Sequence, residues 1–109
     1  MSVNKELMKG STGTLILTLL SRKQMYGYEI IKELELLSDG IFEMGEGTLY
    51  PILHGLEEAG HVESEWVGEK GSRQRKYYRI TKDGRGLLKE KRNEWSSFRS
   101  AVDKVVFGQ

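Results

Sequence analysis

The sequence predicts a mostly helical α+β protein in which three helices and a β-hairpin are followed by one long helix. Three observations carry this prediction. Three helical segments come first, two strand-like segments joined by a glycine-containing loop come next, and an apolar heptad pattern runs through the last quarter of the chain. The 109 residues are enough for about one domain with a modest core.

The first two helices are expected over residues 5–22 and 26–40. The first contains the apolar run LILTLL, which by pattern alone could also be a buried strand, but the flanking segments KELMK and SR favour a helix. In the second, Ile30 and Leu34 return on one helical face, and Gly40 is well placed to end the helix.

The third helix is expected over residues 47–59, and Gly60 is expected to end it. Pro51 falls within or near the first turn, where its missing N–H costs little. The apolar stripe of this helix consists of Leu49, Ile52, Leu53 and Leu56.

Two segments after the third helix, HVESEWV (61–67) and RKYYRI (75–80), have the alternation and residue types of β-strands. Val62 and Trp66 are expected on one face of the first strand. The loop between the strands, GEKGSRQ, holds two glycines and basic residues, as hairpin loops often do. Three helices and a hairpin in this order predict a winged helix-turn-helix, whose third helix enters a DNA major groove while the hairpin, or wing, lies along the phosphates.

The last segment, about 82–107, is expected to form one long helix with Thr81 as its N-cap. Its seam residues are spaced 3, 4, 3, 4, 3 and comprise Leu88, Lys91, Trp95, Phe98, Val102 and Val105. A second copy of the helix is the simplest partner for this stripe, so a two-fold homodimer is predicted. The expected organisation is a winged helix-turn-helix domain over 1–81 and a dimerisation helix over 82–109.

The net charge of +1 hides a strong polarity along the chain. Residues 29–68 carry ten acids and one lysine, whereas residues 69–92 carry ten Lys or Arg and three acids. A concentrated basic segment suggests a polyanion partner, although a solvated charged surface would have the same composition.

The composition also excludes several classes of protein. There are no cysteines, which rules out a disulfide framework, thiolate zinc sites and cysteine nucleophiles. The first residues lack the apolar core of a signal peptide, and LILTLL is too short to span a bilayer. We therefore expect a cytoplasmic protein without a membrane partner.

The candidate DNA contacts lie at the start of the third helix, in the wing and on the first two helices. Thr48 and Tyr50 have hydroxyls that can reach phosphates or bases, although Thr48 as a simple N-cap and Tyr50 as a half-buried ring are the alternatives. Tyr26 opens the second helix, whose N-terminus can attract a phosphate. The cations proposed for phosphate contacts are Arg73, Arg75 and Lys76 in the wing, with Lys5 and Lys9 in the first helix.

No catalytic constellation is found, and neither enzyme activity nor a cofactor is expected. His54, Glu57 and His61 would share a face of an unbroken helix with Glu58 and resemble a metal site, but Gly60 separates His61 from the rest, so surface residues without a metal are predicted.

Trp95 has two interpretations. It is either a core residue of the seam or, facing its copy near a two-fold axis, one wall of a slot for a planar aromatic ligand. Phe98 belongs to the same candidate ligand site.

The segments GTLYPILHGLEEAGHVESEW and RQRKYYRITKDGRGLL, together with YGYEIIKEL, resemble the PadR family of bacterial transcriptional regulators. The short C-terminal region looks like the compact subfamily that includes multidrug-sensing repressors. The resemblance implies a dimeric winged-helix repressor that binds an inverted-repeat operator and is released by a small molecule or a stress signal.

The resemblance also assigns residues by position. It places Thr48 and Tyr50 in the recognition helix and Trp95 where drug-sensing relatives have an aromatic clamp. In or beside the wing it places Gly71, Ser72, Arg73 and Lys76.

Two residues weaken the resemblance near the recognition helix. Gly55 stands where many relatives have a basic residue, and Glu46 adds an anion just before the motif. A winged-helix protein–protein interaction module that binds no DNA therefore remains the alternative, and the acidic 29–65 stretch favours it.

Overall fold

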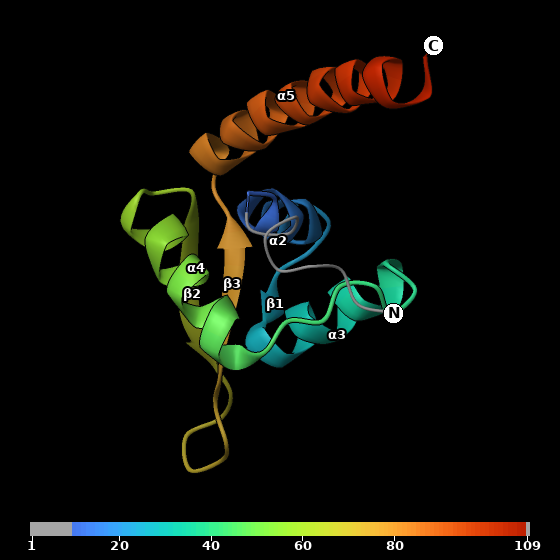
Figure 1. Ribbon diagram of the computed structural model, residues 1–109. Coiled ribbons are helices and arrows are strands. Elements are labelled where there is room, and N and C mark those ends of the chain that lie inside the picture. The colour runs from blue at the N-terminus through green and yellow to red at the C-terminus, as the bar shows by residue number, and fades with distance from the viewer. Residues whose placement is uncertain (1–9, 109) are drawn as a thin grey trace.

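The computed structural model describes residues 10–108, so the predicted contacts of Lys5 and Lys9 lie outside the described residues. In chain order the elements are α2 (Thr12–Leu20), β1 (Met25–Tyr26), α3 (Gly27–Leu37), α4 (Glu46–Glu58), β2 (Val62–Val67), β3 (Arg75–Ile80) and α5 (Lys82–Phe107). Figure 1 shows α2, α3 and α4 gathered beside a small sheet, with the β2–β3 hairpin projecting at one end of the molecule and α5 at the other. The principal extents are 60 × 32 × 21 Å.

The apolar run LILTLL is helical, which confirms the helix and excludes the strand. It forms most of α2, where Ile16 and Leu17 are almost completely buried. Within the described residues this helix begins at Thr12 and ends at Leu20, two residues before the predicted end. The helix ends here because the polar segment Ser21–Gln24 has no apolar face to bury against the core.

The sheet is antiparallel with strand order β1-β3-β2. The hairpin register pairs Val62 with Ile80 and Ser64 with Tyr78. Strand β1 was not expected: its two residues pair with Tyr77 and Tyr78, at a position where the sequence predicted only the start of a helix. A two-residue strand is too short to show an alternating pattern.

Helix α4 covers the beginning of β2 but not its end. Leu49 and Leu53 of α4 are fully buried in the core, as is Val62 of β2. Trp66 shares a face of the strand with Val62 but is 64% exposed. The alternating pattern therefore predicted correctly that Val62 and Trp66 share a face of β2. Whether each side chain is buried depended on how far the helices extend over the sheet.

The predicted long helix is confirmed as α5, and its first turns pack against the rest of the chain. The Thr81 side chain accepts a hydrogen bond from the Gly84 N–H at 3.0 Å, as an N-cap does. Leu88 is buried against the core, whereas Trp95, Phe98 and Val105 are 51%, 62% and 85% exposed. Among residues 10–108 of one chain, the distal half of the apolar seam is therefore largely uncovered.

No helix within residues 10–108 is both long enough and apolar enough to cross a membrane.

Candidate nucleic-acid interface

The solvent-facing side of α4 is the first component of the candidate interface. The exposed residues recur at helical spacing and comprise Glu46, Gly47, Thr48, Pro51, His54, Gly55 and Glu58. The N-cap of α4 is Gly45, so Thr48 is the third helical residue, and it is exposed. His54 lies on the same exposed side, and its spacing of seven residues from Gly47 and three from Pro51 was the signal in the sequence that could have identified it. This face can present a hydroxyl and an imidazole to base edges.

Tyr50 is not on that face. Its half-buried ring packs against the core, and its hydroxyl lies beside Gly27, the first residue of α3. A Cβ at Gly27 would lie 2.8 Å from Tyr50 Cζ, closer than side chains approach one another. Gly27 therefore allows the N-terminal turns of α3 and α4 to meet. Sequence reasoning missed Gly27, although its place between two tyrosines in YGYE was a signal.

Tyr26 joins the start of α3 to the wing. Its ring packs edge-on against Tyr77 with 5.4 Å between centroids, and the Arg75 guanidinium lies 4.5 Å above its centroid. The Tyr26 N–H donates to Glu29 at 3.4 Å, and Lys23 Nζ lies 3.0 Å from the same carboxylate. The hydrogen bond and charge of Glu29 raise the pKa of Lys23. The N-terminus of α3 thus already holds a carboxylate, which a phosphate would have to approach.

The wing loop is a compact turn with exposed cations. Gly71 has φ +91°, a conformation that favours glycine. The backbone N–H and the hydroxyl of Ser72 both donate to the Glu69 carbonyl, at 3.0 and 2.8 Å. The Ser72 hydroxyl is therefore used within the turn, while Arg73 and Lys70 are exposed beside it. Lys70 was not singled out in the sequence, although it lies in the predicted basic loop.

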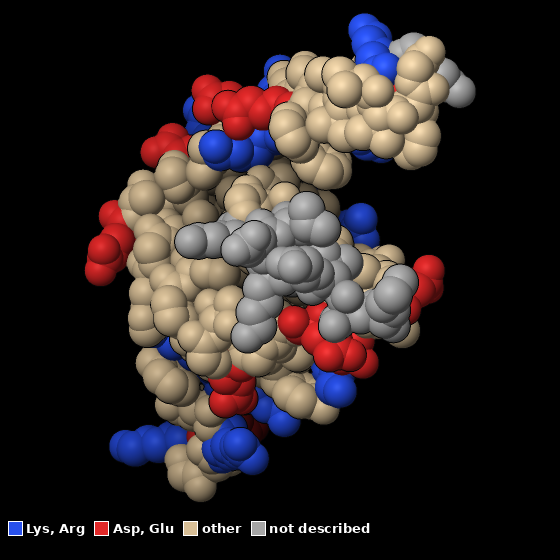
Figure 2. Space-filling model, viewed as in Figure 1, with Lys and Arg blue, Asp and Glu red and all other residues tan. Residues whose placement is uncertain are grey.

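The electrostatics of the sheet differ between its base and its tip. Arg79 bonds Glu63 at 2.8 Å and Glu65 at 3.1 Å, and these contacts raise its pKa. Within residues 10–108, the ion pairs involve Lys23, Arg79 and Lys91 and leave the wing cations unneutralised. Lys76 is half-buried, with Nζ 5.6 Å from the centroid of Tyr78. Figure 2 shows basic side chains at the lower end of the molecule, where Figure 1 places the hairpin.

The candidate metal ligands do not come together. Gly60 adopts φ +81° and ends α4 before His61. Glu57 instead accepts a hydrogen bond from the Ser64 hydroxyl. In the described part of the chain, no group of three or more His, Cys, Asp or Glu residues could hold a metal ion.

Helices α2, α3 and α4 are followed by a hairpin with a cationic tip, and the outer face of α4 is exposed. This arrangement defines a winged helix-turn-helix protein. Residues 16–90 match the model of the family described as "Transcriptional regulator PadR-like family". The chain belongs to this family, and it is a transcriptional regulator.

Individual relatives and solved structures are similar to this chain over most of its length. A structure of a transcriptional regulator from Clostridium thermocellum superposes with a TM-score of 0.86 at 35% identity, covering 93% of this chain and 98% of that one. An uncharacterised protein X of Lysinibacillus sphaericus is 32% identical over 97% of both chains. The transcriptional regulator YqjI of Escherichia coli is 33% identical over 78% of this chain, but the match covers only 39% of its own length.

Proposed function

We propose that the protein is a homodimeric repressor that binds an inverted-repeat operator in the cytoplasm and acts by binding rather than by catalysis. The observation that carries this proposal is the set of unneutralised wing cations next to the exposed face of α4. Phosphate contacts from cations such as Arg73 and Lys70 would supply affinity, and α4 would supply base contacts.

The division of the chain supports a dimer. In this proposal residues 1–81 form the DNA-binding domain and residues 82–109 form the dimerisation helix. The distal apolar stripe of α5, with Trp95, Phe98, Val102 and Val105 at its centre, is exposed in the single chain and is suited to a second copy. A two-fold axis would set the two recognition helices about 34 Å apart, so that they read successive major grooves on one side of the duplex.

A ligand site at the dimer seam is part of the proposal. The Trp95 and Phe98 rings lie 6.1 Å apart with 35° between their planes, and both are exposed. Their flat faces suit a planar aromatic effector that releases the operator. A panel of planar ligands that leaves the fluorescence of Trp95 unchanged, measured with Trp66→Phe as background, would remove this part of the proposal.

The experiment that tests the function is fluorescence anisotropy with duplex DNA from upstream of the protein's own gene, against a scrambled duplex, at low and near-physiological salt. Tighter binding to the upstream sequence, weakening steeply with salt, is the expected result. Equal binding to both duplexes would exclude self-regulation, and no binding to either would exclude a DNA-binding role.

A protein–protein interaction module is the second candidate. Glu46 and Glu58 on the exposed side of α4 favour it, because carboxylates at a DNA interface oppose the phosphates. Titration with nonspecific duplex at low salt separates the two, since a DNA-binding protein retains salt-sensitive affinity for any duplex.

A further inference from the structure

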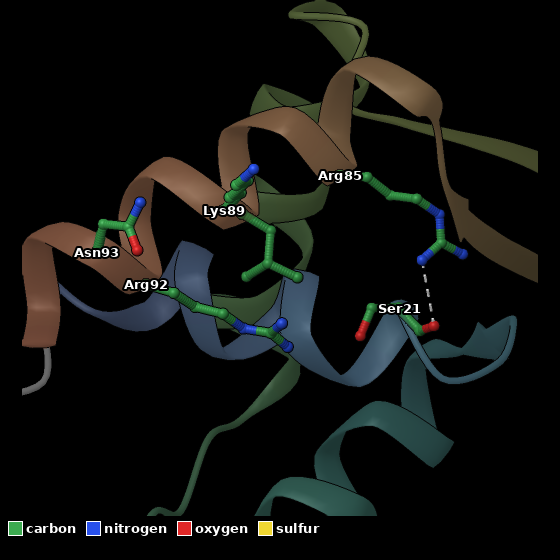
Figure 3. A pocket seen from close by; sticks show the side chains of 6 residues that line it. Ser21, Arg85, Lys89, Arg92 and Asn93 are labelled. Carbon is green, nitrogen blue, oxygen red and sulfur yellow. Dashed lines mark hydrogen bonds between the residues drawn. The ribbon is translucent and has the colours of Figure 1, made fainter.

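A hollow of about 350 Å³ lies between the C-terminal end of α2 and the first half of α5 (Figure 3). Its lining consists of Ser21, Arg85, Leu88, Lys89, Arg92 and Asn93. A second hollow of about 280 Å³ shares Ser21 and Arg85 with the first and adds Arg22. The larger volume is at the lower end of the range of small-molecule sites, about 300–1,000 Å³.

The charge in this hollow has one sign. Arg85, Lys89 and Arg92 line it, no carboxylate does, and no ion pair in residues 10–108 neutralises any of the three. The opposing charge is the C-terminal end of α2, equivalent to roughly half a negative unit. Arg85 Nη1 lies 3.5 Å from the Ser21 carbonyl and offsets that end of the helix. The charges of Lys89 and Arg92 therefore have no opposing charge in the lining of the hollow.

The free donors indicate the chemistry of the ligand. Ser21 donates its hydroxyl proton to the Thr18 carbonyl at 2.6 Å and has none to offer. Arg92 extends from α5 towards α2 (Figure 3), and its planar guanidinium can donate two parallel hydrogen bonds to a carboxylate or phosphate. Lys89 and Asn93 add further donors beside the nearly buried Leu88.

We propose that this hollow, which we call the α2–α5 pocket, binds a small organic anion bearing a phosphate or carboxylate group. The pocket is separate from the DNA contacts. In Figure 1 the junction of α2 and α5 lies at the opposite end of the sheet from the wing tip, so a duplex along α4 and the wing does not reach it.

The test is isothermal titration of the full chain with pyrophosphate and with citrate, without DNA and at constant ionic strength set by chloride. We expect saturable binding of one anion per chain. Tighter binding of pyrophosphate would assign the pocket to phosphates, and tighter binding of citrate to carboxylates. Arg92→Gln and Lys89→Gln, both exposed positions, should each lower the affinity about tenfold through loss of a charged hydrogen bond.

Arg99→Gln is the matched control, because Arg99 follows Arg92 by two helical turns and lies outside the pocket. It removes the same charge and should leave the affinity unchanged. Melting temperatures check that each variant is folded. Absence of saturable heat with both anions, or equal weakening in Arg99→Gln, would overturn the proposal. Anion binding by the monomer but not by the dimer would also overturn the proposal, because a second copy of the chain would then occupy the pocket. Since no DNA is present, failure here would leave the proposed DNA binding untouched.

Discussion

The recognition helix and the wing are neighbours with opposite charge. Helix α4 contains no Lys or Arg and has acids at both ends, whereas residues 68–76 carry four cations and one acid. A helix without cations gains little affinity from phosphates, and a cation that contacts a phosphate reads no base sequence. In the proposed function, therefore, the wing supplies affinity and α4 supplies specificity.

The two regions also differ in how they are held. Helix α4 is fixed by apolar packing through Leu49 and Leu53 and by the close approach of Tyr50 to Gly27. The wing loop is fixed by backbone geometry and by the turn at Glu69–Ser72. Substitutions can therefore disturb one region without the other.

The largest expected effect comes from removing charge from the wing. Replacing Arg73 and Lys76 with Ala should weaken binding to every duplex about tenfold or more at low salt. It should also flatten the slope of log affinity against log salt by about two. Lys82→Ala with Lys104→Ala removes the same charge from α5 and serves as control. Unchanged slopes in anisotropy titrations would exclude the wing as the source of affinity.

Gly27→Ala should disturb the recognition helix without changing its charge. The added Cβ meets the Tyr50 ring, so we expect a loss of about 1–3 kcal/mol in the free energy of unfolding and weaker operator binding.

Tyr50→Phe is the partner variant. Alone, it should leave the fold intact and operator binding nearly unchanged, because the Tyr50 hydroxyl lies beside Gly27 and not on the exposed face of α4. It removes the atom nearest the new Cβ, so Gly27→Ala should cost less stability in its presence. Urea unfolding of the four proteins measures the coupling, and simple additivity would mean that the two residues do not act through this contact.

Gly55→Arg gives α4 the cation that it lacks and should strengthen DNA binding. Gly55 is exposed, and nothing lies within 4 Å of a Cβ built there, so a side chain can begin at this position without a clash. One added phosphate contact should steepen the salt slope by about 0.9 and raise affinity severalfold at low salt. Gly55→Ala isolates the gain in helix propensity, about 1 kcal/mol of stability. If both variants bind DNA equally, a side chain at position 55 does not reach the DNA phosphates.

The smallest expected effect is a change in stability at alkaline pH, and it concerns Tyr78, which lies beneath the wing in β3. Burial, with a smaller contribution from Glu57 of α4, raises its pKa above the ordinary 10.0. Above pH 10 the unfolded chain releases the phenol proton first, so the free energy of unfolding should fall as pH rises towards the raised value. Urea unfolding at pH 8 and pH 11 should show a smaller decline for Tyr78→Phe than for the exposed control Tyr28→Phe.

The sequence predicted those parts of the candidate interface that depend on local pattern. The wing cations were found because they interrupt a strand–loop–strand pattern, and α4 because its leucines recur at helical spacing. His54 and Gly27 were missed, because exposure of one and the tight contact of the other depend on which elements pack together. Tyr50 has a hydroxyl that suggested a DNA contact, yet the packing of α3 against α4 places that hydroxyl beside Gly27.

By itself, then, the sequence determined the order of three helices, hairpin and long helix, the ends of α3 and α4 at glycines, and the segregation of charge. These features follow from side-chain periodicity, backbone freedom and charge along the chain, which are local properties. Only the packing of the elements against one another set the pairing of β1, the exposure of Trp66 and the position of Ser21 opposite the basic face of α5. Those features arise between residues far apart in the chain, where burial and electrostatic fields depend on distances that no local pattern encodes.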